Sequence, residues 1–280
     1  MKILITGKTG FIGSHLIEDL STEHNMVSTS RNELELTNPD QVREFFTKNK
    51  FDLIINTATT GGKTGNIDGP ETLYNNLAIT FNLLKFKHPD TKIFNFTSGY
   101  ELDKNIDHSE DNSSFFGFYP LDYYGMSKNI ISRIYSNYSD VYTFRLFGVY
   151  GEYEKDNRFI KRNIIKYINH QPLVVVQDRY LDFTYIDDIT RVIKYYIKNI
   201  NNELDNFIDI TPPKKYSLVD TVNIINNLDK HKVEIIINEE GLGLGYTGNG
   251  EQFLKIIPDY TTLEEGIKNV YNYINKTLWK

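Results

Sequence analysis

Apolar and polar positions along the chain predict strands and helices that follow one another in turn. Short apolar runs rich in β-branched residues, at 2–6, 26–30, 52–57, 92–97 and 141–145, are typical of buried strands. The segments between them, at 11–20, 39–49, 72–87 and 121–137, are predicted to be helices. Strands that alternate with helices form a parallel, doubly wound sheet, so we expect an α/β fold that binds its ligands at the carboxyl ends of the strands.

Beyond residue 150, helices are predicted at 157–169 and 187–198, and strands at 173–176 and 181–186. The alternation of strands and helices weakens after residue 199, where strands are predicted at 207–210 and 233–237. Ser217 and Thr262 are predicted N-caps with an acid three residues later, and only Thr262 is expected to form a capping box. The glycine-rich run 241–250 lacks a strand–helix frame and is predicted to be a flexible loop on the substrate side. We expect one domain over 1–150, to which 181–210 returns, and a smaller domain over 151–180 and 211–280.

Three glycines follow the first predicted strand, at Gly7, Gly10 and Gly13. In a dinucleotide site, the first glycine permits a tight turn, the second lets the backbone approach a pyrophosphate, and the third lets helix and strand pack closely. The N–H groups and positive dipole end of the helix then face the phosphates. The alternative is a plain strand–turn–helix. We favour the dinucleotide site, with the binding residues Gly7, Thr9, Gly10, Phe11, Ile12 and Gly13.

The residues after the second predicted strand bear on the choice of cofactor. Proteins that prefer NAD usually place an Asp or Glu there to bind the ribose hydroxyls, whereas this chain has Arg31. A guanidinium binds a 2′-phosphate that a carboxylate would repel. We therefore predict NADPH (NADP) over NADH, with NAD still possible, and Lys8 and Thr9 could help to hold the phosphate. The alternative for Arg31 is a solvated surface residue.

Composition excludes several classes of function. A net charge of -6 gives no basic surface for nucleic acid, and no apolar run approaches the roughly 20 residues of a membrane helix. The absence of cysteine excludes disulfides and thiolate metal sites, and we expect no metal. Met1-Lys2 leads directly into a strand, so we expect no signal peptide and predict a cytoplasmic protein.

Ser98, Tyr124 and Lys128 are the candidate catalytic residues. Ser98 follows the fourth predicted strand, and the other two are four residues apart on one face of the next helix. A cationic Lys and the positive charge of a nicotinamide lower the pKa of a Tyr, whose ordinary value is about 10. The Ser hydroxyl can orient a substrate oxygen, the Tyr can exchange its proton, and the nicotinamide can exchange a hydride with the adjoining carbon. The Tyr–Lys spacing alone is expected by chance, and its place after a glycine turn and Ser98 makes it informative.

These motifs resemble those of extended short-chain dehydrogenases/reductases that act on nucleotide sugars. The resemblance covers nearly the whole chain and rests on the segments ITGKTGFIGSHL at the start, NNLAITFNLL around Asn76, TSG with Ser98, YYGMSK with Tyr124 and Lys128, FRLFGVYG from Phe144 and LDFTYIDDI from Leu181. It implies a Rossmann domain and a C-terminal domain that holds a nucleoside-diphosphate sugar. It also implies that the three candidates are catalytic, that Lys128 holds the cofactor ribose, and that Ala58 and Asn76 lie near the cofactor.

Some segments indicate a subfamily. The residues from Arg31 and from Ala58 to Lys63 look most like GDP-fucose synthase, which uses NADPH. Sugar 4,6-dehydratases carry an acidic pair directly after the catalytic Ser or Thr, where this chain has Gly99 and Tyr100, and this argues against dehydration.

Other positions depart from the family pattern. Tyr100 replaces the Cys base of GDP-fucose synthases, and Arg158 is the nearest match to their His, which puts carbon epimerisation by that route in doubt. Gly148 replaces a usual Asn, and Leu181 replaces an Arg whose contact with the diphosphate Arg179 could take over. We predict Tyr100, Arg158 and Arg179 as substrate-binding residues; for the two arginines the alternative is surface solvation.

The leading hypothesis is an NADPH-dependent reductase of a nucleotide-bound 4-keto-deoxysugar, with epimerisation at C3 or C5 left open. The alternative is a redox-neutral 4-epimerase with tightly held NAD. A dinucleotide sensor without enzyme activity ranks below both, because such proteins tend to lose the Tyr–Lys pair. The nucleotide base, the sugar and the product stereochemistry stay open. The resemblance also implies a homodimer formed through the helices at 72–87 and 121–137.

Overall fold

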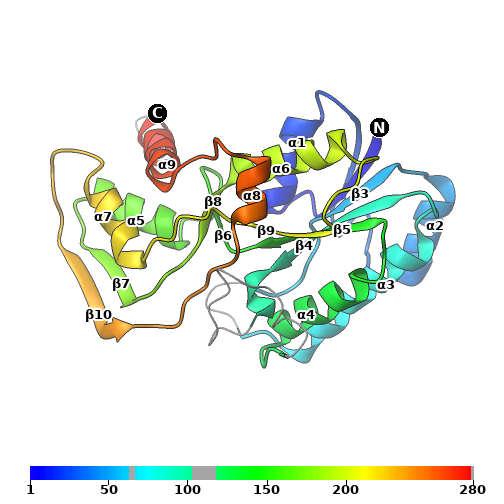
Figure 1. Cartoon of the computed structure of the whole chain (residues 1–280), viewed down its shortest axis with the longest axis horizontal. Coiled ribbons are helices and arrows are strands. Elements are labelled where there is room, and N and C mark those ends of the chain that lie inside the picture. Colours follow the sequence, from blue (N-terminus) through cyan, green and yellow to red (C-terminus); the bar gives the residue numbers. More distant parts are fainter. Residues whose placement is uncertain (63–66, 103–117, 279–280) are drawn as a thin grey trace. The chain divides into compact units, whose positions relative to one another are not determined.

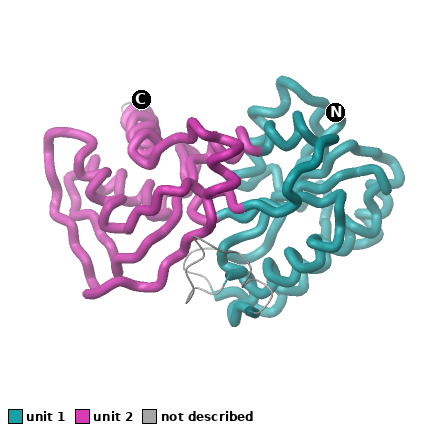
Figure 2. Tube along the Cα trace, viewed as in Figure 1, with its two compact units in different colours: residues 1–103, 113–146, 193–208 teal, residues 104–112, 147–192, 209–280 magenta. Residues whose placement is uncertain are grey.

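The computed structural model describes residues 1–62, 67–102 and 118–278. These residues form two compact units (Figure 2): unit 1 comprises 1–62, 67–102, 118–146 and 193–208, and unit 2 comprises 147–192 and 209–278. Each unit has a hydrophobic core of its own. The predicted loop at 103–117 and part of the one at 63–70 lie outside the described residues.

A six-stranded sheet forms the centre of unit 1, in the order β2-β1-β3-β4-β5-β9. Its strands are β1 (Lys2–Thr6), β2 (Asn25–Thr29), β3 (Leu53–Asn56), β4 (Lys92–Ser98), β5 (Val141–Leu146) and β9 (Phe207–Ile210). The pairs from β2 to β5 are parallel. The chain passes from β1 to β2 on one side and then to β3 on the other, so the loops after β1 and β3 diverge, which is where such sheets bind ligands.

Helices cover both faces of this sheet (Figure 1). On one face, α3 (Pro70–Phe86) packs against both α2 (Pro39–Lys48) and α4 (Tyr123–Tyr135). On the other face lie α1 (Phe11–Leu20) and α6 (Ile186–Lys198), and Lys194 of α6 forms an ion pair of 2.9 Å with Glu23, just after α1. This arrangement confirms the predicted doubly wound α/β fold.

Local sequence explains where these helices begin. The Asn38 side chain accepts hydrogen bonds from the N–H groups of Asp40 and Gln41, and Pro39 occupies the first turn, where its missing N–H costs nothing. Asp122 caps α4 in the same way by accepting from Gly125 N at 2.7 Å. The cap fixes the first turn of the helix that carries Tyr124.

Unit 2 combines small sheets with helices. β7 (Leu173–Asp178) pairs in parallel with β10 (Ile235–Leu242), and β6 (Gly148–Tyr150) pairs in parallel with β8 (Phe183–Tyr185). Its helices are α5 (Phe159–Ile168), α7 (Leu218–Asn226), α8 (Glu251–Ile256) and α9 (Leu263–Leu278), and the first part of α6 also belongs to it. Residues from α5, α7, α9 and β7 form its core.

The structure corrects two predictions in unit 2 and adds two elements. Ser217 does form a reciprocal capping box, because its hydroxyl accepts from Asp220 N and the Asp220 carboxylate accepts from Ser217 N; a short Asp can therefore close the box that was expected only for Thr262. The run 241–250 is not wholly a loop, because β10 extends to Leu242 and pairs there with Asp178. β6 and α8 were not predicted, since each is too short to show a periodic pattern.

None of the helices in the described part of the chain is both long and apolar enough to cross a membrane.

Candidate active site

The glycine turn lies at the divergence of the loops after β1 and β3. Gly7 has φ +76°, a conformation that side chains strongly disfavour, and its N–H donates to Thr29 O at the end of β2. Gly13 lies inside the first turn of α1, where a Cβ atom would collide with Gly7 O and would come 2.7 Å from Thr57 Oγ1. Only a glycine therefore lets α1 approach β1 and β3 this closely.

The first turn of α1 fits a phosphate. Gly10 is the N-cap and provides no side-chain cap, so the first N–H groups of the helix receive no bond from it. Phe11 and Ile12 begin the helix half-buried, and Thr9 beside them is exposed. A glycine backbone at a helix N-terminus that lacks a side-chain cap suits the pyrophosphate of a dinucleotide.

Two cations lie near the end of β2, and each is paired with a carboxylate. Lys8 Nζ is 2.6 Å from Glu33 Oε1, and Arg31 Nε is 3.0 Å from Glu35 Oε2. Glu33 also accepts from Ser30 N and Ser30 Oγ at 2.7 Å. These bonds, first that of Lys8, lower the pKa of the Glu33 carboxyl to about 2.

Sequence reasoning missed Glu33. It stands a few residues beyond the position where the acid of NAD-binding proteins is usually sought, and the turn after β2 brings it back to the glycine loop. The signal was the Ser-x-x-Glu spacing from Ser30, which is typical of such a reciprocal turn.

Asn76 holds the loop that follows β3. It is buried, and its side-chain oxygen accepts from Thr60 N at 2.8 Å. Its amide nitrogen donates to Thr60 O at 3.0 Å and to Ser127 Oγ at 2.9 Å. Asn76, predicted beside the cofactor, thus ties this loop, which begins at the half-buried Ala58, to α4.

The structure brings Ser98, Tyr124 and Lys128 together. Ser98 is the last residue of β4 and hydrogen-bonds the Tyr124 phenol. Lys128 Nζ lies 5.6 Å from the centre of the Tyr124 ring and donates to Phe96 O at 3.1 Å. Gly62 lies against the Tyr124 ring, because a Cβ atom added there would come 2.7 Å from Tyr124 Cζ.

The surroundings shift both titrating groups. Burial raises the pKa of Tyr124 to about 12, against the opposing effect of the Ser98 hydrogen bond. Burial lowers the pKa of Lys128 to about 8, against the opposing charge of Glu101. Tyr124 is therefore protonated at neutral pH in the protein alone, in the state that can donate a proton.

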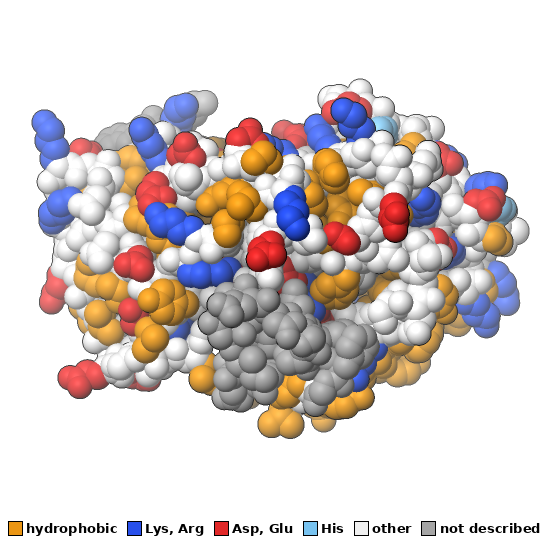
Figure 3. Space-filling model, in the orientation of Figure 1, with side chains coloured by type: hydrophobic (Ala, Val, Ile, Leu, Met, Phe, Trp, Pro, Cys, Tyr) orange, Lys and Arg blue, Asp and Glu red, His pale blue; other side chains and the backbone are white. Residues whose placement is uncertain are grey.

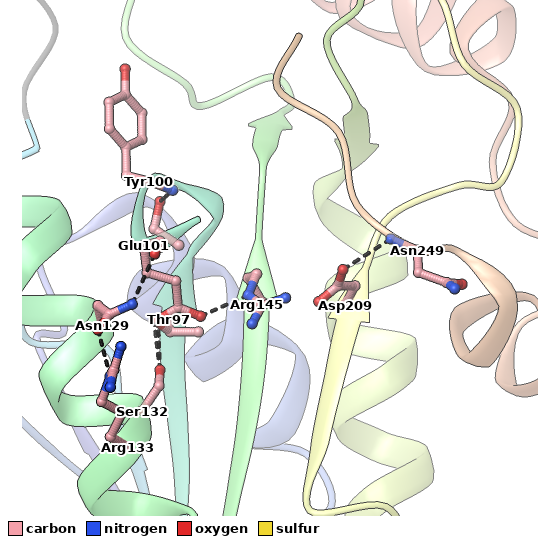
Figure 4. A network of polar contacts seen from close by, with 10 residues as sticks. Thr97, Tyr100, Glu101, Asn129, Ser132, Arg133, Arg145, Asp209 and Asn249 are labelled. Atoms are coloured by element: carbon pink, nitrogen blue, oxygen red, sulfur yellow. Dashed lines mark hydrogen bonds and ion pairs between the residues drawn. The ribbon is translucent and has the colours of Figure 1, made fainter. Parts of the chain in front are cut away.

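Glu101 is a second acid that sequence reasoning missed. It is fully buried, and its carboxylate accepts from Arg145 Nε at 2.6 Å, while the Tyr100 ring points the opposite way (Figure 4). The signal was Arg145 itself, because an arginine inside an apolar strand needs a buried acid as partner.

Tyr100 stands beside Tyr124. Its ring meets that of Tyr124 edge to face at 6.1 Å, and its side chain is 43% exposed. Its position is compatible with the predicted contact with substrate, since its side chain is accessible and adjoins the Tyr124 ring.

The two predicted substrate arginines both lie in unit 2. Arg158 is the N-cap of α5 and forms an ion pair of 3.0 Å with Glu154, a buried residue whose carboxyl has its pKa raised to about 7, chiefly by burial. Arg179 follows β7, and its buried Nε has no hydrogen-bond partner among the described residues. Nearby, Lys215 Nζ lies 2.6 Å from the buried Asp182, whose Oδ1 has no partner in the same described part of the chain.

Comparisons with known proteins identify the family. The family described as "NAD dependent epimerase/dehydratase family" matches residues 3–208. CDP-abequose synthase of Yersinia pseudotuberculosis is 26% identical over 279 residues, which cover 93% of this chain and 92% of that protein.

Solved structures share the fold. MlghC, a GDP-mannoheptose C4 reductase from Campylobacter jejuni with NADP bound, has a TM-score of 0.83 at 21% identity and covers 98% of both chains. UDP-glucuronic acid 4-epimerase from Bacillus cereus, in complex with UDP-glucuronic acid and NAD, has a TM-score of 0.75 at 20% identity, over 99% of this chain and 100% of that one. With the glycine turn and the Ser–Tyr–Lys site in place, the match over residues 3–208 means that this chain belongs to the NAD dependent epimerase/dehydratase family, a family of NAD(P)-dependent enzymes within the extended short-chain dehydrogenases/reductases.

Proposed function

We propose that this protein is an NADPH-dependent reductase of a nucleoside-diphosphate 4-keto-deoxysugar. The observation that carries the proposal is the hydrogen bond between Tyr124 and Ser98, with Gly99 and Tyr100 rather than acids directly after Ser98. Gly99 and Tyr100 occupy the positions of the dehydratase acids, and the carboxylate of Glu101 is occupied by Arg145. Such a site suits the delivery of one proton to a carbonyl oxygen.

Each residue has a defined task in this proposal. Ser98 orients the C4 carbonyl oxygen, and Tyr124 donates its proton to that oxygen. Lys128 stabilises the phenolate that is left and binds the cofactor ribose. The bound nicotinamide supplies the hydride. Unit 1 holds the dinucleotide through Gly7, Gly10 and Gly13, and unit 2 holds the nucleotide sugar, with Arg179 as a diphosphate ligand and Arg158 as a further substrate contact.

The similar proteins support a substrate of this class. MlghC is described as a C4 reductase of a GDP-sugar, with NADP bound. The names of the two other proteins described above refer to CDP- and UDP-linked sugars. The shared chemistry is a sugar joined to a nucleoside diphosphate.

One observation favours the alternative of an NAD-dependent 4-epimerase. Glu33 places a carboxylate beside the glycine loop, and a carboxylate at the end of the second strand is the usual ligand of an unphosphorylated ribose. In that case NAD would stay bound through catalysis, and the reaction would consume no reduced cofactor.

The experiment offers purified protein NADPH or NADH with 4-keto-6-deoxy derivatives of GDP-, UDP-, CDP- and dTDP-sugars. We expect NADPH absorbance to fall with at least one of them. Tyr124→Phe should lower the rate by about 10²- to 10⁴-fold, whereas the neighbouring Tyr123→Phe should not. No oxidation with any keto sugar would refute the reductase. Retained NAD together with inversion at C4 of a plain nucleotide sugar would establish the epimerase.

We also infer a homodimer formed through α3 and α4. Hydrophobic side chains stand exposed on this pair of helices, with Tyr74 70%, Phe81 53% and Tyr123 37% exposed. In Figure 3 hydrophobic side chains gather along the lower edge, where Figure 1 shows the same helices. Tyr74 and Phe81 are seven residues apart and thus share one face of α3, as an interface with a second copy requires.

A further inference from the structure

A buried carboxylate connects the elements that carry the catalytic residues. Glu101 ends the short helical turn η1 (Gly99–Glu101), which follows β4 directly. Its carboxylate accepts from Thr97 Oγ1 at 2.6 Å, from Ser132 Oγ at 2.7 Å and from Arg145 Nε at 2.6 Å (Figure 4). With three bonds and no exposed surface, this carboxylate is not placed to exchange protons with a substrate.

The partners of Glu101 lie next to the catalytic side chains along the chain. Thr97 directly precedes Ser98 on β4, and Thr97 and Arg145 are register partners across β4 and β5. On α4, Ser132 lies one turn beyond Lys128, and Asn129 Nδ2 donates to the Glu101 carbonyl at 3.0 Å. One residue thus joins η1, β4, β5 and α4, which together hold the catalytic serine, tyrosine and lysine.

The charges of Glu101 and Arg145 depend on each other. The Arg145 side chain is 1% exposed, and its guanidinium carbon also lies 4.5 Å from the centre of the Phe207 ring. Removal of one partner leaves the other charge buried without its counter-ion. The negative charge of Glu101 raises the pKa of both Lys128 and Tyr124. Among the described residues, Asp68 and Tyr100 act on Tyr124 in the same direction.

We propose that Glu101 is a positioning residue of the catalytic site: its carboxylate, paired with Arg145, fixes β4, η1 and α4 so that Ser98, Tyr124 and Lys128 keep their geometry and surroundings. The inference rests on the catalytic roles given to these three residues in the proposed function. Glu101 would act on the reaction through Ser98, Tyr124 and Lys128, without contacting the substrate itself.

The test measures the protonation of Lys128 in the protein alone. Lysine labelled with ¹³C at Cε is followed by NMR across a pH titration, and Lys128→Met assigns the signal. Glu101→Gln keeps the shape of the side chain and removes its charge; its single carbonyl oxygen can still accept from one side, whereas its amide NH2 can only donate. We expect it to move the Lys128 midpoint to lower pH by roughly one pH unit. The double variant Glu101→Gln/Arg145→Met, with both charges removed, should lie between this variant and the wild type.

Asp140→Asn is the matched control. Asp140 forms an ion pair of 2.5 Å with the half-buried Lys87 in the same unit and directly precedes β5, at the opposite end of that strand from Arg145. It removes the same charge from another ion pair of unit 1, and we expect the Lys128 midpoint to stay within about 0.2 pH unit of the wild type.

The proposal is overturned if Glu101→Gln leaves the Lys128 midpoint in place, or if Asp140→Asn moves it equally. Should Glu101→Gln fail to fold, the double variant decides, because an unchanged midpoint there contradicts the role of the charge. A loss of stability alone would lower the melting temperature and leave the Lys128 titration midpoint unmoved, so it cannot be mistaken for the expected result. The measurement needs no substrate or cofactor, so a failure of the proposed reductase activity is seen separately.

Discussion

Arg31→Ala is expected to weaken the binding of NADPH and to leave that of NADH unchanged. Arg31 follows β2, where the 2′-phosphate of NADPH distinguishes it from NADH. In the protein alone its guanidinium holds Glu35 at 3.0 Å, so a phosphate would have to replace that partner. The expected loss is therefore the difference between the two interactions.

The expected loss of NADPH binding energy follows from the exposure of the Arg31–Glu35 pair. Arg31 is 59% exposed and Glu35 31%, and a surface pair of this kind at helical spacing is worth about 0.3–0.5 kcal/mol. A charge-assisted hydrogen bond to phosphate is worth about 1.5–3 kcal/mol, and exposure places Arg31 at the lower end. The net loss of roughly 1–1.5 kcal/mol corresponds to about a fivefold to tenfold rise in the Kd of NADPH.

The assay is a fluorescence titration of purified protein with NADPH and with NADH at low ionic strength. Arg43→Ala is the matched control, because Arg43 is similarly exposed and paired with Asp40 at 2.8 Å but lies on α2. Equal losses for both cofactors, or a loss in the Arg43 variant, would refute the reasoning. Glu33→Gln extends the test: it frees Lys8 and removes a charge that repels phosphate, so NADPH binding should strengthen at least twofold.

Three further predictions concern stability and assembly. Gly13→Ala forces α1 away from Gly7 O, so we expect the free energy of unfolding in urea to fall by about 1–3 kcal/mol and both cofactors to bind more weakly. The control Gly245→Ala, whose Cβ would meet its nearest atom at 3.7 Å, should change neither quantity. The pKa of the Glu154 carboxyl is raised to about 7, so the folded chain binds this proton more tightly than the unfolded chain, and the free energy of unfolding falls as pH rises from about 4.5 to 7. Glu154→Gln should remove this pH dependence and be more stable than the wild type above pH 7 by roughly 2–3 kcal/mol. Parallel curves of unfolding free energy against pH for the two proteins would contradict the assignment. Phe81→Glu places a charge on the exposed face of α3 and should lower the molar mass measured by light scattering from that of a dimer to that of a monomer. The control Tyr195→Glu, at an exposed position of α6, should leave the molar mass unchanged. The molar mass of a monomer for the wild type and both variants would refute the dimer.

Local patterns in the sequence determined most of the fold. The apolar run of β1, the glycines after it and the helical spacing of α1 each extend over a few residues, so the strand, turn and helix could be placed without knowledge of distant partners. The same holds for Tyr124 and Lys128, because four residues of helix bring two side chains to one face wherever the helix packs. The order of strands and helices then predicted the parallel sheet and the edge at which Ser98 ends β4.

Only the tertiary structure decided which polar groups meet. Glu101 reaches Arg145 across 44 residues, Asn76 reaches Ser127 across 51, and Glu33 reaches Lys8 across 25. Such partners follow from strand register and from the close approach of loops, neither of which is encoded in a short window. A buried charge or amide must find a partner, and the sequence indicates that need without saying which partner fills it. For this reason the site residues could be listed from the sequence, whereas the carboxylates that surround them and shift their pKa values emerged only from the folded chain.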